Sequence, residues 1–299
     1  MLIRFRILIL LAALGVNSSF AQRYPTLKHV DVRARVTYDF RDHFFYYSYS
    51  LANAVESIGS IESFRIDLAR TANTIQYDSI GLRFAGDDFI EEEFRKNYSA
   101  LSRETVLVGF QSLPSGWSVL WGQRLATISK DTEFIAPGHS VDGIIMMSRS
   151  LPGIRRCVVE PDFQVDQYFP SIDDPANTFT VEQTSAIEEA QKYFCATIGP
   201  WAPNAKFEPA VFLDTMSAFI RQSRSFKWIP TDNIAKKYLG YLDEVRVQLL
   251  SGKKSEANEI LKTILSNADV DSSSVITSEA YALIRYNAEY FADRLKQMK

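Results

Sequence analysis

The hydrophobic pattern of this 299-residue chain changes its period once, near Pro209. Before Pro209, apolar residues recur at every second position, as in a β-strand that has one solvent-facing side. After it they recur every three to four positions, as on the buried face of an amphipathic helix. This single change predicts a β-rich N-terminal domain followed by an all-helical C-terminal part, rather than alternating strands and helices.

The strand signal is clearest in the alternation from Val30 to Phe40. Further runs are predicted as strands at 45–53, 64–68, 105–110, 117–121, 140–147, 154–159 and 193–198. Turn residues such as Pro137-Gly138 and Pro152-Gly153 separate several of them. Many short strands with such turns predict an antiparallel β-sandwich over residues 22–200, with an irregular excursion at about 162–192. The segment 200–203 is predicted as the junction, because Pro200 and Pro203 resist both helix and central strand.

Four amphipathic stretches follow on short connections, starting at or near Pro209, Thr231, Ser255 and Thr277. Proline is tolerated at the first position of a helix, and Ser251-Gly252 suits a helix end. The stretches predict a small all-α bundle of about four helices over residues 207–299.

Residues 1–21 have the features of a cleavable signal peptide. Arg4 and Arg6 precede an apolar run, and the small residues Ser19 and Ala21 precede Gln22. The run is shorter than the roughly 20 residues of a transmembrane helix, and we expect no transmembrane segment after cleavage. An uncleaved anchor is the alternative. The features predict a secreted, periplasmic or extracellular protein that begins near Gln22.

The C-terminal stretch, residues 207–295, resembles the FIMAH-like helical modules that end many secreted bacterial proteins. The residues that carry the resemblance are Phe219-Ile220, Trp228-Ile229, Leu249 to Gly252, Ile276 to Tyr281 and Asn287-Ala288. Members of that family usually have a glycine before the Trp, where this chain has Lys227. The N-terminal part resembles the β-rich domain that often precedes the module, in stretches such as Tyr47 to Leu51, Phe64 to Asp67 and Leu151 to Ile154. The resemblance implies export and modular organisation, and no particular reaction.

Several classes of partner and chemistry are disfavoured. The formal net charge of −3 argues against nucleic acid as a partner. The histidines His29, His43 and His139 lack the spacing of a metal site, so neither a metal nor another cofactor is predicted. Residues 267–271 superficially resemble a calcium loop, but Ser272 and Ser278 stand where such a loop needs Gly and Glu. We therefore predict a polar connection between helices there.

No catalytic residue is predicted. The chain contains neither Gly-x-Ser-x-Gly nor a glycine-rich phosphate-binding loop. The acidic cluster Asp87-Asp88 and Glu91 to Glu93 is typical of a solvated surface, because adjacent carboxylates repel one another. These observations favour a non-catalytic protein.

Two pairs of residues are candidates for a site. Trp117 and Trp121 lie four apart on a predicted strand and hence on one face, where they could stack on a sugar or fill the core. Core is the more frequent fate, and we predict it for Trp117 and at least part of Trp121. Cys157 and Cys195 could form a disulfide in an oxidising compartment, or remain two small buried thiols. The preceding arginines, Arg155 and Arg156, would lower the pKa of the Cys157 thiol.

Three functions remain open from the sequence. The first is an exported, non-catalytic binding or surface-associated protein, whose partner could be a cell-surface polysaccharide or a protein. The second is a carbohydrate-binding or carbohydrate-active extracellular protein. The third is a structural accessory protein whose helical module docks a partner.

Overall fold

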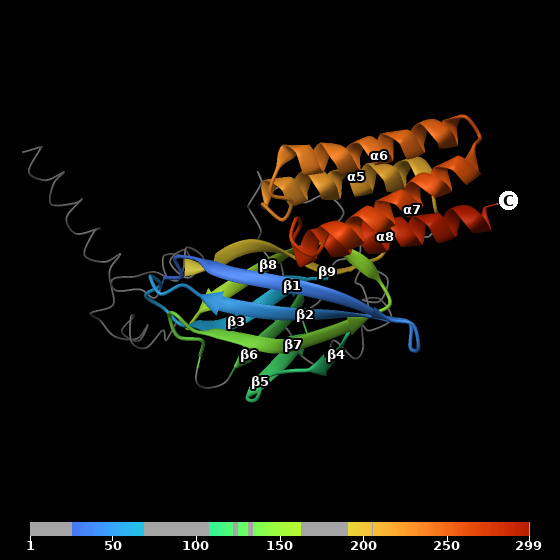
Figure 1. Cartoon of the computed structure of the whole chain (residues 1–299). Helices are drawn as coiled ribbons and strands as arrows, with labels where there is room; N and C mark the ends of the chain where they lie inside the picture. The colour runs from blue at the N-terminus through green and yellow to red at the C-terminus, as the bar shows by residue number, and fades with distance from the viewer. Residues whose placement is uncertain are drawn as a thin grey trace, which may run out of the picture.

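The computed structural model describes residues 26–68, 108–121, 125–130, 134–162, 191–204 and 206–298. The predicted signal peptide, the acidic cluster and most of the predicted excursion lie outside these residues. The described chain forms two antiparallel sheets and then four helices, which lie on one side of the sheets (Figure 1). The predicted order, strands first and helices last, is confirmed.

The first sheet has the strand order β1-β2-β7-β4. Its strands are β1 (Val30–Asp39), β2 (Phe44–Asn53), β7 (Ser140–Ser148) and β4 (Gly109–Ser112). Alternate residues of β2 are buried from Phe45 to Asn53, which is the pattern of a strand with one face on a core. β1 lies at an edge of this sheet and pairs with β2 as a hairpin.

The second sheet has the strand order β5-β6-β3-β8-β9. Its strands are β5 (Trp117–Trp121), β6 (Leu125–Lys130), β3 (Ile61–Asp67), β8 (Leu151–Pro161) and β9 (Tyr193–Trp201). The sequence did not predict β6, whose buried side chains, among those that the structure describes, are the short pair Ala126 and Ile128. An alternation this brief does not stand out from a loop.

Tyrosines of β2 join the two sheets. The ring of Tyr49 lies 5.6 Å from the ring of Phe64 in β3. Its hydroxyl donates a hydrogen bond of 2.8 Å to the carbonyl oxygen of Ile198 in β9. Tyr47 is also fully buried, and its hydroxyl donates to the carbonyl oxygen of Ser150 at 2.6 Å. Side chains of the first sheet therefore pack into the same core as the second sheet.

The four helices are α5 (Pro209–Ser225), α6 (Asp232–Leu250), α7 (Lys254–Asp271) and α8 (Ser278–Gln297). The hydroxyls of Thr231 and Thr277 cap α6 and α8 by accepting hydrogen bonds from backbone N–H groups. The prediction of four helices is confirmed. The helical period after Pro209 also predicts that Val211 shares the buried face of α5, but Val211 is exposed. Of the four, α8 lies against strands β1, β8 and β9 (Figure 1).

Side chains of α8 satisfy backbone groups of the sheets. Ser278 donates to the carbonyl oxygen of Ala34 at 2.9 Å, and the Tyr286 hydroxyl donates to that of Val36 at 3.3 Å. The fully buried Asn287 donates to the carbonyl oxygen of Pro152 at 2.9 Å. An edge strand exposes unpaired N–H and C=O groups, so these bonds explain how α8 can cover the edge of β1.

One predicted turn is wrong, and the predicted junction at 200–203 begins too early. Pro152-Gly153 lies within β8, and the reversal before it is at Arg149 and Ser150. The predicted junction at Pro200 lies within β9, which runs on to Trp201. β9 is an edge strand in which proline is tolerated, and Pro200 stands opposite Pro152. Gly153 is required for close approach, because a Cβ there would lie 2.5 Å from the Cβ of Trp201.

Candidate ligand-binding cleft

A cleft of about 630 Å³ lies between the β1–β2 hairpin and α8. Its walls come from four places: the hairpin, the turn that joins β7 to β8, Ala202 and Pro203 after β9, and the exposed side of α8. Five aromatic side chains line it: Tyr38, Phe40, Phe45, Tyr286 and Tyr290. Its volume falls in the range typical of small-molecule sites, about 300–1,000 Å³.

The hairpin side of the cleft is an aromatic cluster around Tyr38. The Tyr38 ring centre lies 4.9 Å from that of Phe40 and 4.7 Å from that of Phe45. The Tyr38 hydroxyl lies 3.1 Å from Nδ1 of His43, which adopts the left-handed φ of 61° at the hairpin turn. Phe40 is 72% exposed, so the turn presents this ring to solvent.

The helix side is formed by Tyr286 and Tyr290, which are one turn apart on α8. The Tyr286 ring lies 5.2 Å from the ring of Phe45, and this contact joins the two walls at the base of the cleft. Burial raises the pKa of the Tyr286 hydroxyl, which keeps it protonated as a donor to the carbonyl oxygen of Val36. The Tyr290 ring packs 5.3 Å from Phe212 of α5. Contacts within the core thus hold both tyrosines in place.

Charged groups of both signs stand at the rim. Glu289 accepts from Arg285 at 3.0 Å, and Asp293 accepts from Lys296 at 2.9 Å. Arg149 stands on the opposite side, with its guanidinium carbon 5.0 Å from the ring centre of Phe44. Aromatic faces beside carboxylates and a guanidinium can stack on a ligand and hydrogen-bond to it at the same time.

A second hollow, of about 600 Å³, lies beside the first and shares Tyr38 and Phe40 with it. It opens over the outer face of the first sheet, where Tyr46 and Gln111 line it. The Tyr46 hydroxyl donates to the carboxylate of Asp42, which lowers the pKa of Asp42. Phe40 therefore stands between two hollows, and a ligand longer than one cleft could contact both.

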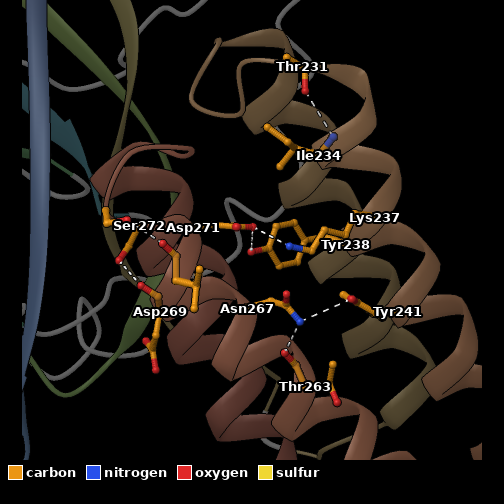
Figure 2. Close-up of polar contacts among 12 residues, drawn as sticks. Thr231, Ile234, Lys237, Tyr238, Tyr241, Thr263, Asn267, Asp269, Asp271 and Ser272 are labelled. Atoms are coloured by element: carbon orange, nitrogen blue, oxygen red, sulfur yellow. Dashed lines mark hydrogen bonds and ion pairs between the residues drawn. The ribbon is translucent and has the colours of Figure 1, made fainter.

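A polar cluster that is separate from the cleft lies between α6 and α7. Asp271 accepts hydrogen bonds from Lys237 at 2.9 Å and from the buried Tyr238 at 2.6 Å (Figure 2). Burial raises the pKa of Asp271, but these two bonds bring it below its ordinary value. Lys237 and Tyr238 both donate to the Asp271 carboxylate between the helices, so we assign the cluster a structural role. Residues 267–271 form the last turn of α7, so the predicted polar connection is wrong there.

The structure places the two predicted tryptophans at opposite ends of β5. Trp117 is buried in the hydrophobic core, as predicted, and its ring offers no open platform for a ligand. The side chain of Trp121 lies outside the described part of the structure.

The two predicted cysteines come together. Cys157 of β8 stands opposite Cys195 of β9, which confirms that the two strands are neighbours, and both are free thiols. The prediction that the arginines lower the pKa of Cys157 is wrong, because burial raises it. Arg155 is itself buried and donates from Nε to the carbonyl oxygen of Pro200 at 2.8 Å.

Within the described ranges, no group of three or more His, Cys, Asp or Glu side chains is placed to hold a metal ion. Among the same residues, no helix is both long and apolar enough to cross a membrane.

Sequence reasoning missed the aromatic cleft. Its hairpin and α8 walls are more than 240 positions apart, and the period of each element explains its tyrosines and phenylalanines as ordinary core residues. Phe40 could have indicated an exposed aromatic side chain, because it is apolar and directly precedes the polar turn Arg41-Asp42-His43. No family model matches the chain, and no curated protein gives a significant match to it.

Proposed function

We propose that this protein is an exported, non-catalytic binding protein whose ligand occupies the cleft between the β1–β2 hairpin and α8. Export rests on the signal-peptide features of residues 1–21. The non-catalytic assignment rests on the missing hydrolase and phosphate-binding motifs in the sequence.

We infer that the two sheets form a β-sandwich and that the helices are a FIMAH-like module docked on it. The shared core around Tyr47 and Tyr49 supports the sandwich. The four-helix architecture is compatible with the module. In this arrangement the cleft lies where the module meets the sandwich, and both parts contribute to the binding site.

The exposure of Phe40 carries the proposal. This ring is 72% exposed, although it stands beside the ring of Tyr38, which in turn packs on Phe45 in the cleft wall. Leaving a phenylalanine in water forgoes roughly 1.5–3 kcal/mol of burial free energy. Exposed aromatic clusters beside a hollow are typical of binding surfaces, where a ligand covers the ring.

A carbohydrate is the ligand class that the cleft favours. Sugar rings present an apolar face to aromatic side chains and hydroxyls to carboxylates and guanidinium groups. The cleft offers Tyr290 and Phe40 for stacking, with Asp293 and Arg149 near them. A cell-surface polysaccharide fits both this lining and the proposed export.

An array of bacterial and eukaryotic glycans, probed with the purified protein, tests the proposal. We expect a restricted set of glycans to bind the wild type and the control Leu250→Ala, whose side chain is 83% exposed on α6. Phe40→Ala should bind the same glycans about tenfold more weakly while keeping the wild-type circular dichroism spectrum. Equal glycan binding by Phe40→Ala and wild type, or no binding by the wild type, would contradict the proposal.

A further inference from the structure

The two cysteines stand opposite each other on neighbouring antiparallel strands. Cys157 of β8 is in register with Cys195 of β9. Their sulfur atoms lie 2.6 Å apart, and no disulfide joins them in this structure. The fold therefore places the two thiols side by side.

The backbone is compatible with a bond between these sulfurs. Opposed residues of an antiparallel pair have Cα atoms about 4.5 or 5.5 Å apart, depending on their hydrogen bonding. A disulfide needs about 4.4–6.8 Å, so either kind of pair can be bridged without moving a strand.

The two thiols differ in their access to solvent. Cys157 is 1% exposed and belongs to the hydrophobic core. Cys195 is half-buried and lies on β9, an edge strand of its sheet. Cys195 is therefore the more accessible of the two cysteines, and Cys157 is the one enclosed by the core.

We propose that Cys157 and Cys195 are a dithiol oxidised by disulfide exchange, with Cys195 as the entry thiol and Cys157 as the resolving thiol. The Cys195 thiolate attacks one sulfur of a disulfide such as oxidised glutathione, forms a mixed disulfide, and expels one thiolate. The Cys157 thiolate then attacks Sγ of Cys195 and expels the second thiolate. The protein loses two protons and two electrons, and the oxidant becomes two thiols.

The chemistry of the two thiols suits this order. Burial raises the pKa of Cys157, so it stays protonated and unreactive toward solution reagents. Once Cys195 carries a leaving group, the neighbouring sulfur needs only a short movement to displace it. The reaction is then intramolecular, and proximity compensates for the small thiolate fraction.

The bond would have a structural consequence. The cysteines are 38 positions apart, so it would close a large loop and restrict the unfolded chain. It would also fix β9, whose last residue, Trp201, packs 5.8 Å from Phe212 and 5.5 Å from Phe219 of α5. Oxidation should therefore stabilise the strand that leads into the helices.

The full chain incubated with oxidised glutathione tests the proposal, with products measured by mass spectrometry after alkylation of the remaining thiols. Wild type should lose both alkylatable thiols, retain no glutathione, and gain several degrees in melting temperature. Cys157→Ala should accumulate a stable mixed disulfide with one glutathione. Cys195→Ala should react at least tenfold more slowly. Alanine is used because a buried cysteine behaves as a small apolar residue.

Three results would overturn the proposal. They are two free thiols in the wild type at every glutathione ratio, a stable mixed disulfide on the wild type, and equal reaction rates for the two variants. If either variant fails to fold, time-resolved peptide mapping of the wild type decides the order. The first glutathione adduct must lie on Cys195, and an adduct found first on Cys157 would contradict the assignment.

Discussion

Glu279 in the first turn of α8 accepts a hydrogen bond of 2.7 Å from the backbone N–H of Ala34 in β1. Both residues are buried, with exposed fractions of 4% and 1%. β1 is an edge strand, and this N–H points away from its partner β2 toward the helix. The Glu279 carboxylate thus links α8 to β1 across 245 positions of sequence.

Glu279→Ala removes this acceptor and leaves the N–H of Ala34 buried without its partner. We predict a loss of about 1–3 kcal/mol in the free energy of unfolding, the usual cost of an unsatisfied buried donor. Urea denaturation followed by circular dichroism measures it. The control is Glu259→Ala on α7, where the side chain is 64% exposed and a change within about 0.5 kcal/mol is expected. Equal effects of the two substitutions would show that the buried bond contributes nothing.

Trp117→Ala empties a site in the core of the second sheet. The ring is 8% exposed, so we predict destabilisation of about 3–5 kcal/mol, as for other buried tryptophans. Leu120→Ala, on the same strand but 57% exposed, should change stability by much less. Chemical denaturation of both variants decides the matter. A Trp117→Ala variant of wild-type stability that had lost glycan binding would instead place this ring in the ligand site.

Tyr238→Phe removes one of the two hydrogen bonds that lower the pKa of Asp271. At pH 7 we predict a loss of roughly 1.5–3 kcal/mol, typical of a hydrogen bond to a charged group. Because the native pKa of Asp271 lies below the unfolded value of about 4, this contribution is complete above that pH. It decreases as the pH falls through the native pKa.

The measurement is the difference between wild-type and Tyr238→Phe urea midpoints at pH 7 and at pH 3, which should shrink at the lower pH. The matched control is Tyr241→Phe on the same helix, whose hydroxyl contacts the non-titrating amide of Asn267 at 3.4 Å. Its effect should be small and the same at both pH values. A Tyr238→Phe difference that does not change with pH would contradict the assigned role of Asp271.

Local patterns predicted most of the described elements. The alternation after Val30 and the helical face of α8, from Ala280 to Leu295, are both observed. Such patterns are readable because the apolar residues of a strand or helix recur with its period on the side that is buried. Pro152 and Pro200 were misassigned as a turn and a junction. Proline interrupts a strand only at a position where the backbone N–H must donate a hydrogen bond to a neighbouring strand. Here the two prolines face each other beside the edge of a sheet.

The candidate site was beyond local patterns. The contact of Phe45 with Tyr286 depends on how α8 docks, and the docking depends on single polar contacts such as Asn287 with Pro152. No period in the sequence records such a pairing. The cysteines differ in this respect, since the sequence predicted a strand around each one and the expected compartment allowed the two to pair.

The most direct test of the central claim is isothermal titration calorimetry with the glycan that binds best on the array. Phe40→Ala is expected to raise the dissociation constant about tenfold, because loss of one aromatic stacking contact costs up to roughly 1.5 kcal/mol. Leu250→Ala, at a side chain that is also highly exposed but lies outside the cleft, should bind as the wild type does. An unchanged dissociation constant for Phe40→Ala, or an equal loss in both variants, would contradict a ligand site between the β1–β2 hairpin and α8.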